Sequence, residues 1–201
     1  DGECVMTQSL SRDDIIRGLK ELADDLNSRG ISAEIFIIGG AALVLRYFDR
    51  RLTSDVDLRA LNFDIIRPSA EAVADMNGWD PDWINNAATQ FVPSLGKSVT
   101  WETLFENKGV SFKVTTPEVM LVMKLAASRT GRDDQDIANL LAITGLSTLE
   151  ELEGLFEEYF PYFFLLGFSE AWLSGMVMTL FVVYRPNWVL TFKDSCYLCD
   201  K

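Results

Sequence analysis

The 201-residue sequence contains no histidine. Serine hydrolase triads, cysteine proteases of the Cys-His type and histidine-ligated zinc hydrolases are therefore excluded. Any acid–base or metal chemistry must come from carboxylates and lysine. Cysteine is also scarce: Cys4, Cys196 and Cys199 are too few and too close to the ends for a disulfide framework, which favours a reducing, cytoplasmic setting. Cys196-x-x-Cys199 could bind metal or cycle redox, but it has neither the second pair typical of a zinc site nor the βαβ context typical of a redox motif.

Positive charge is the second shortage. There are 18 basic against 30 acidic residues, a net charge of -12. This charge opposes non-specific adhesion to nucleic acid, which depends on neutralising phosphates. Apolar residues make up 48% and charged residues 24%, as in soluble globular proteins. No secretory signal pattern is present, because the first long apolar run begins only at Ile35.

Strand and helix patterns alternate along the first 160 residues. Apolar spacing and turn residues predict helices over 11–30, 41–47, 68–76, 117–127, 132–143 and 148–159, and strands over 33–38, 54–59, 99–105 and 110–114. Asn107-Lys108-Gly109 predicts a hairpin turn between the last two strands. The expected fold is α/β (α+β), a short mixed sheet flanked by helices, with a core over 1–116 and a helical part over 117–160.

Residues 161–201 form an apolar tail of a different character. Over 161–184 the only charge is Glu170, and no clear amphipathic period is present. Three interpretations remain open: a helix that docks on the domain, a membrane segment, or an end that does not belong to the ancestral domain, such as a read-through or frameshifted end. Glu170 in the middle of a span opposes the membrane interpretation.

The chemistry concentrates around Gly39-Gly40 and Asp55-x-Asp57. Alternation on a strand places both carboxylates on one face, where they could hold one or two Mg²⁺ ions that clamp a phosphoryl displacement. A glycine turn before a helix offers backbone N–H groups to a triphosphate, and Thr53 could add a hydroxyl. Each part alone has an ordinary interpretation, since Gly-Gly is often only a turn and Asp-x-Asp a solvated face.

Together these segments support a resemblance to a known family. Gly39-Gly40 with Arg51-x-Thr53-x-Asp55-x-Asp57 resembles the polymerase-β-like minimal nucleotidyltransferases, nearest to the AbiEii-like toxins of type IV toxin–antitoxin systems and their uncharacterised relatives. Residues 124–129 followed by 132–137 are similar to the family's lysine helix and its Arg-Asp-x-x-Asp helix. The stretch 82–87 is similar to a Trp-Leu-Asn-Asp stretch of the uncharacterised branch. The resemblance covers about residues 10–158.

The resemblance implies a role for each matching position. Asp55 and Asp57 would bind Mg²⁺, Lys124 would contact phosphate or the developing negative charge, and Asp133 or Asp136 would be the later catalytic carboxylate. The triphosphate of the NTP would be handled by Gly39, Gly40, Arg51 and Thr53. Two alternatives stay open: Lys124 as a surface lysine whose stem lies along an apolar helix, and the acids as an ordinary first helical turn.

The sequence departs from the family at the third carboxylate. Many polymerase-β-like enzymes place a third aspartate on a following strand, whereas 110–114 carries Lys113 and no acid. We expect Asp133 or Asp136 to complete the site; the alternatives are Glu102, or a catalytically weakened domain. The tryptophans Trp79, Trp83 and Trp101 either stack on a base or, as the preferred interpretation, fill the core.

The function that follows is transfer of a nucleoside monophosphate from an NTP to an acceptor hydroxyl. By resemblance, the acceptor would be the 3′ end of tRNA or a protein, and the chain a toxin or antitoxin with a cognate partner. The acidic charge slightly favours a protein or small-molecule acceptor. Two alternatives are a catalytically degenerate module that binds nucleotide or a partner, and a small-molecule (antibiotic) nucleotidyltransferase. A membrane would be involved only through 161–184.

Overall fold

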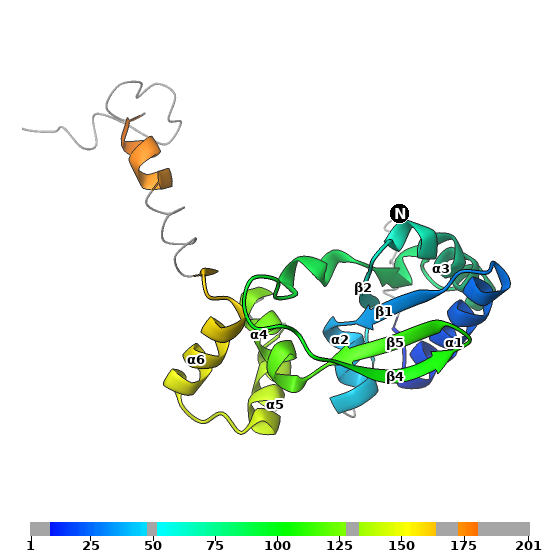
Figure 1. Cartoon of the computed structure of the whole chain (residues 1–201), viewed down its shortest axis with the longest axis horizontal. Coiled ribbons are helices and arrows are strands. Elements are labelled where there is room, and N and C mark those ends of the chain that lie inside the picture. Colours follow the sequence, from blue (N-terminus) through cyan, green and yellow to red (C-terminus); the bar gives the residue numbers. More distant parts are fainter. Residues whose placement is uncertain (1–8, 48–51, 128–132, 164–172, 181–201) are drawn as a thin grey trace, which may run out of the picture. The chain divides into compact units, whose positions relative to one another are not determined.

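The computed structural model of the chain describes residues 9–47, 52–127, 133–163 and 173–180 (Figure 1). Its internal contacts divide it into two units, Asp1–Tyr159 and Phe160–Lys201. The first unit contains the sheet and the helices α1 to α6, and every candidate site residue that is described lies in it. In the second unit, residues 173–180 are helical. Arg51, Cys4, Cys196, Cys199 and most of 161–184 lie outside the described residues.

The sheet has five strands in the order β3-β2-β1-β5-β4. The strands are β1 (Ala33–Ile37), β2 (Val56–Ala60), β3 (Ile84–Asn85), β4 (Trp101–Asn107) and β5 (Val110–Thr115). The central strand β1 pairs antiparallel with β2 and parallel with β5. The outer pairs are β2 with β3, which is parallel, and β4 with β5, which is antiparallel. The predicted α/β fold with a mixed sheet is thus confirmed.

The two faces of the sheet have opposite characters. Alternating positions on β1, β2 and β5 form a fully buried core face: Ile35, Ile37, Val56, Leu58, Val110, Phe112 and Val114. The other face, called here the open face, carries Phe36, Asp57, Arg59 and Lys113. Strand register places Phe36 beside both Arg59 and Lys113, and Asp57 lies two residues before Arg59 on the same strand. The charged side chains of these strands therefore lie on the open face of the sheet.

Helix α1 (Arg12–Ser28) supplies much of the core opposite these strands. Ser11 caps it through a capping box: the Ser11 hydroxyl accepts a hydrogen bond from the Asp14 backbone N–H, and the Asp14 carboxylate accepts one from the Ser11 backbone. Its buried stripe consists of Ile15, Gly18, Leu19, Leu22, Ala23 and Leu26. The capped amphipathic helix predicted from the sequence is confirmed.

The glycine segment differs from its prediction. Gly39 and Gly40 do not form a turn ahead of the helix but are the first residues of α2 (Gly39–Ala42), which continues as a π-helix, η1 (Leu43–Tyr47). Contacts from elsewhere hold this unusual turn: Arg12 Nη2 donates to the Leu45 carbonyl (3.3 Å), and the Tyr47 hydroxyl donates to the Thr115 carbonyl. These distant partners stabilise a geometry that local sequence does not specify.

Helix α3 (Phe63–Asn77) begins five residues before the predicted start at Pro68. The predicted helix starts at Pro68, whereas in the structure Pro68 lies inside the helix, where its missing N–H removes a backbone hydrogen bond. The buried stripe begins before it, with Ile66, Ser69, Ala70, Val73 and Ala74. Burial of Ile66 favours extending the helix toward its N-terminus more than Pro68 opposes it.

The remaining elements follow the sequence closely. Strands β4 and β5 form the predicted hairpin, with positive φ at Lys108 and Gly109, although β4 begins at Trp101 rather than at 99. Beyond β3 and the short 3-10 helices η2 (Pro81–Trp83) and η3 (Ala87–Phe91), the C-terminal part contains α4 (Pro117–Ala127), α5 (Asp134–Thr144) and α6 (Leu149–Tyr159). Among the described residues, no helix combines the length and apolar character that crossing a bilayer requires.

Candidate active site

Asp57 and Gly39 lie against each other at the end of β1. A β-carbon added to Gly39 would lie 2.5 Å from the Asp57 Oδ2 atom, and Gly39 has φ +65°. The Ile38 backbone N–H donates to the Asp57 carbonyl at 3.0 Å, which fixes this approach. Only glycine combines that backbone angle with room for the carboxylate. The two halves of the motif are therefore in direct contact.

Asp55 precedes β2 and is held by two side chains. Ser54 Oγ donates to Asp55 Oδ1, and Asn85 Nδ2 donates to Asp55 Oδ2, each at 3.0 Å. The amide of Asn85 is itself fixed, because its Oδ1 accepts from the Ala87 backbone N–H (3.0 Å). A carboxylate has about four lone-pair sites, so these two hydrogen bonds orient Asp55 and leave oxygen lone pairs for a cation.

Thr53 belongs to the same loop. It forms an isolated bridge with Leu10, and its hydroxyl donates to the Asp55 backbone carbonyl at 3.2 Å. The hydroxyl is thus used to shape the backbone at Asp55. A role toward phosphate stays a prediction, as does that of Arg51, which lies outside the described residues.

Comparison with known families agrees with this geometry. Residues 15–163 match the model of a family described as nucleotidyltransferase of unknown function (DUF6036). The match covers more than half of the chain and includes both aspartates, both glycines and the later helices. The chain belongs to this family. No curated protein and no solved structure matches it.

The second cluster of this nucleotidyltransferase domain joins α4 to the start of α5. Lys124 Nζ lies 2.6 Å from Asp133 Oδ1 and 2.9 Å from Asp136 Oδ2. All three residues are buried, with Lys124 8% exposed, so the interpretation of Lys124 as a surface lysine is wrong. The structure brings together the three residues that the resemblance grouped, as a buried triad of one cation and two carboxylates. Their catalytic role stays a prediction.

Glu102 does not join the aspartates. It pairs with Val114 in the β4–β5 ladder and thus points to the core-face side, opposite Asp57. Its carboxylate forms an ion pair with Arg46 of η1 (2.8 Å). Next to that pair, burial and then the charge of Glu102 raise the pKa of Tyr47 above its ordinary value. Tyr47 therefore stays protonated and donates to Thr115.

The three tryptophans take different positions. Trp83 is fully buried and its Nε1 donates to the Ala70 carbonyl at 2.9 Å, as a core residue would. Trp79 packs on Trp83, with ring centroids 4.9 Å apart. Trp101 instead lies half-buried beside Phe36 on the open face (4.6 Å between centroids). The preferred core interpretation therefore fits Trp83 but not Trp101.

A divalent cation would depend on few protein ligands here. Within the described residues no group of three His, Cys, Asp or Glu side chains is placed to hold a metal ion. Asp55 and Asp57 supply oxygen donors next to a backbone with no β-carbon, a donor set that suits Mg²⁺ completed by water and substrate phosphates. The residues present fit a cation that arrives with its nucleotide.

Sequence reasoning did not assign a role to Asn85, although it is part of the third matching stretch. Its amide reaches Asp55 across 30 positions of sequence. The only sequence signal for Asn85 is its place in that stretch, because its contact with Asp55 depends on the pairing of β3 with β2. The open-face pocket beside Phe36 was also missed, because exposure of one sheet face depends on where the helices pack.

Proposed function

We propose that the chain is a Mg²⁺-dependent nucleotidyltransferase that moves a nucleoside monophosphate from an NTP to an acceptor hydroxyl. The observation that carries this proposal is the contact between Gly39 and Asp57 next to an Asp55 that Asn85 and Ser54 orient. Family membership supports the same class of reaction. The AbiEii-like relationship and a toxin–antitoxin role, with a cognate partner protein, belong to the proposal as well.

In this reaction the acceptor oxygen attacks the α-phosphorus, the bond to the bridging oxygen breaks, and pyrophosphate leaves. Mg²⁺, when bound, neutralises the charge that builds on the phosphoryl oxygens. Asp55 and Asp57 would hold that ion and orient the α-phosphate. Gly39, Gly40, Thr53 and Arg51 would lie along the β- and γ-phosphates. The hydroxyl proton must go to a base, and without histidine a carboxylate is the natural one.

Asp133 and Asp136 are the proposed sources of that carboxylate. Both carboxylates pair with Lys124, at 2.6 and 2.9 Å from its Nζ atom. A lysine in this position could also stabilise negative charge on the phosphates. Either role requires the triad to face the nucleotide.

The proposal is tested with purified protein, Mg²⁺ and each labelled NTP. Candidate acceptors are tRNA, co-expressed partner proteins and an aminoglycoside, so that labelling identifies the acceptor class, the antibiotic alternative included. We expect Asp55→Asn and Asp57→Asn to abolish labelling, and Asp64→Asn, an exposed acid in the first turn of α3, to leave it unchanged. If no NTP labels any acceptor with the unaltered protein, the enzymatic proposal fails.

One observation favours a second candidate, a degenerate domain that binds nucleotide without turnover. The open face of β5 presents Lys113, which pairs with Glu34, where a third acid would stand. Isothermal titration calorimetry separates the two candidates. Tight binding of Mg²⁺ and NTP with no labelled product supports the degenerate module.

A further inference from the structure

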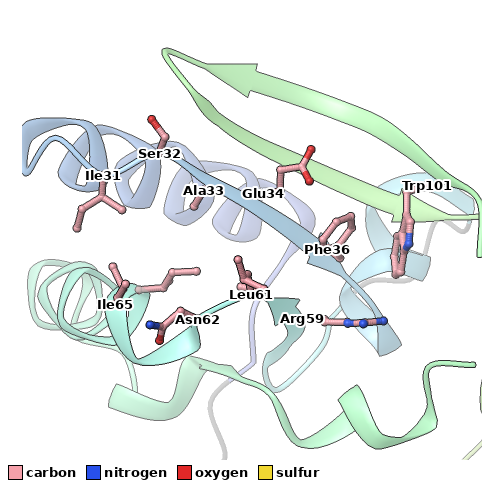
Figure 2. Close-up of a pocket in the computed structure, with 12 residues that line it drawn as sticks. Ile31, Ser32, Ala33, Glu34, Phe36, Arg59, Leu61, Asn62, Ile65 and Trp101 are labelled. Atoms are coloured by element: carbon pink, nitrogen blue, oxygen red, sulfur yellow. The ribbon is translucent and has the colours of Figure 1, made fainter. Parts of the chain in front are cut away.

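The open face of the sheet contains a pocket of about 630 Å³, whose wall includes Arg59, two residues beyond Asp57 on β2. Its walls include Phe36, Arg59, Leu61, Asn62, Ile65 and Trp101 (Figure 2). The volume lies in the range of pockets that bind small ligands, of roughly 300 to 1,000 Å³.

The pocket adjoins the carboxylates through β1 and β2. Phe36 and Arg59 are register partners, and Arg59 follows Asp57 by two residues on the same face. Two residues along a strand span about 7 Å, a distance that a ribose covers between its base and its 5′-phosphate. Figure 2 shows Phe36 and Trp101 at the same end of the pocket, with the Arg59 side chain extending toward that end. Asp57 is not part of the pocket wall, but this end of the pocket is the one nearer to it along β2.

The walls at this end suit a flat ring. Phe36 and Trp101 pack with their centroids 4.6 Å apart, and Trp101 remains half-exposed. Farther along, Leu61 is 104% exposed and Ile65 48% exposed, so large apolar side chains meet solvent at the margin of the pocket. Aromatic and apolar walls bind planar heterocycles because every base has a face on which to stack.

Asn62 and Arg59 are polar groups of the pocket wall that remain available for hydrogen bonds. Asn62 is the N-cap of α3, yet its side chain makes no capping bond. Arg59 is exposed, and among the described residues none forms an ion pair or hydrogen bond with its side chain. Glu34, the other charged residue of the wall, is neutralised by Lys113. The Arg59 guanidinium can therefore bind an anionic group of a ligand, and the Asn62 amide can hydrogen-bond to the edge of a ring.

We infer that this pocket binds a nucleotide, with the base stacked at Phe36 and Trp101, the Asn62 amide at an edge of the ligand, and Arg59 at the phosphate. The inference rests on the proposed function, because it places the phosphate toward Asp57. Two sources present this chemistry: the donor NTP, or the terminal nucleotide of an RNA acceptor. The net charge of -12 opposes binding of a long nucleic acid along the protein surface, but it does not oppose binding of a single nucleotide in a pocket.

The experiment compares binding of nucleosides, NTPs, Mg²⁺ with inorganic triphosphate, and a short RNA, by calorimetry and tryptophan fluorescence. We expect Trp101→Leu to weaken binding of base-containing ligands about tenfold and to leave inorganic triphosphate unchanged. Trp79→Leu, outside the pocket, is the matched control. Arg59→Gln and Asn62→Ala change exposed side chains; the first should weaken nucleotides more than nucleosides, and the second should weaken both.

These measurements distinguish the donor NTP from the RNA acceptor, and they test the pocket separately from the proposed function. An effect of Trp101→Leu on NTP binding assigns the pocket to the donor, and an effect on the RNA alone assigns it to the acceptor. If Trp101→Leu and Asn62→Ala change neither NTP binding nor RNA binding, the inference is overturned. It is also overturned if analytical ultracentrifugation shows that the unaltered protein is a dimer and that Trp101→Leu makes it a monomer, because the pocket would then be an interface between two copies of the chain. Loss of Mg²⁺–triphosphate binding in Asp57→Asn reports on the proposed function independently, because that probe carries no base.

Discussion

The Asp57 carboxylate lies so close to Gly39 that a β-carbon on this residue would be 2.5 Å from Oδ2, closer than two such atoms can pack. The glycine therefore does more than end a strand: it allows a carboxylate against the main chain at the first residue of α2. Loss of this space should disturb the metal-binding geometry and the fold together.

Gly39→Ala tests that relationship. Gly30 is a matched control, because it has φ +69° and a β-carbon there would have no neighbour within 4 Å. We expect Gly30→Ala to cost about 1 to 2 kcal/mol for the left-handed backbone. Gly39→Ala should cost at least about 1 kcal/mol more, the usual scale of overpacking. Equal losses in urea unfolding would show that Asp57 moves aside freely.

Asn85→Ala removes the amide that donates to Asp55 Oδ2 and leaves both aspartates in place. Residues that orient metal ligands typically contribute about 10- to 100-fold in activity or metal affinity. We expect a loss of that size in nucleotidyl transfer and in Mg²⁺-dependent NTP binding. Asn86→Ala is the control, since Asn86 is exposed and its side chain does not cap η3. Unchanged kinetics in Asn85→Ala would show that Ser54 alone positions Asp55.

Lys124→Met removes the cation from between two buried carboxylates. Removing one partner of a buried ion pair typically costs about 3 to 5 kcal/mol, because the other partner loses a close opposite charge where water does not replace it. We expect a loss of that order in the free energy of unfolding. Glu150→Gln, a change at an exposed acid in the first turn of α6, should change it by less than about 0.5 kcal/mol.

A triple variant gives that prediction a second measurement. Adding Asp133→Asn and Asp136→Asn to Lys124→Met replaces the two carboxylates that lose Lys124 by neutral amides, so part of the lost stability should return. If Lys124→Met alone unfolds like the unaltered protein, the triad contributes nothing to stability.

The sequence predicts the parts of this fold that depend on local pattern. The alternation at 54–59 predicts the strand that carries Asp57, although β2 begins at Val56 and leaves Asp55 in the preceding loop, and Ser11 with the spacing of Ile15 and Leu19 specifies α1. The hairpin turn is readable from Asn107-Lys108-Gly109 because positive φ favours glycine there. In each case the deciding interaction joins residues that are near in sequence.

What the sequence does not predict depends on distant partners. The π-helix at 43–47 is held by Arg12 and Thr115, and the start of α3 is set by burial of Ile66 rather than by Pro68. Asn85 reaches Asp55 only once β3 has paired with β2. Lys124 and its two carboxylates were grouped by resemblance, and their mutual pairing inside the protein was not predictable from spacing.

Ser69→Ala should stabilise the protein. The Ser69 hydroxyl is fully buried in α3 and has no hydrogen-bond partner among the described residues. An unsatisfied buried polar group costs about 1 to 3 kcal/mol, and alanine also has the higher helix propensity. We expect a gain of about 1 kcal/mol in the free energy of unfolding. Thr144→Ala, whose hydroxyl donates to the Leu140 carbonyl (3.0 Å), should give no gain.

The capping box of α1 should make stability depend on acid pH. Hydrogen bonds from the side chain and backbone of Ser11 lower the pKa of Asp14 below its ordinary value of 3.8, and Arg17 lowers it further. A carboxyl whose pKa is lower in the folded state contributes stability that is present above 3.8. That contribution is lost as the pH falls below 3.8 and through the lowered value.

Asp14→Asn measures this contribution, with Asp13→Asn, an exposed acid of the same turn, as control. Urea unfolding at pH 7 should show Asp14→Asn less stable than the unaltered protein, because the amide loses the charge-assisted bonds to Ser11 and Arg17. The difference should shrink between pH 4 and pH 2, as Asp14 itself becomes protonated. Asp13→Asn should follow the unaltered protein throughout. A difference that is constant over this range would mean that the Asp14 charge takes no part in the cap.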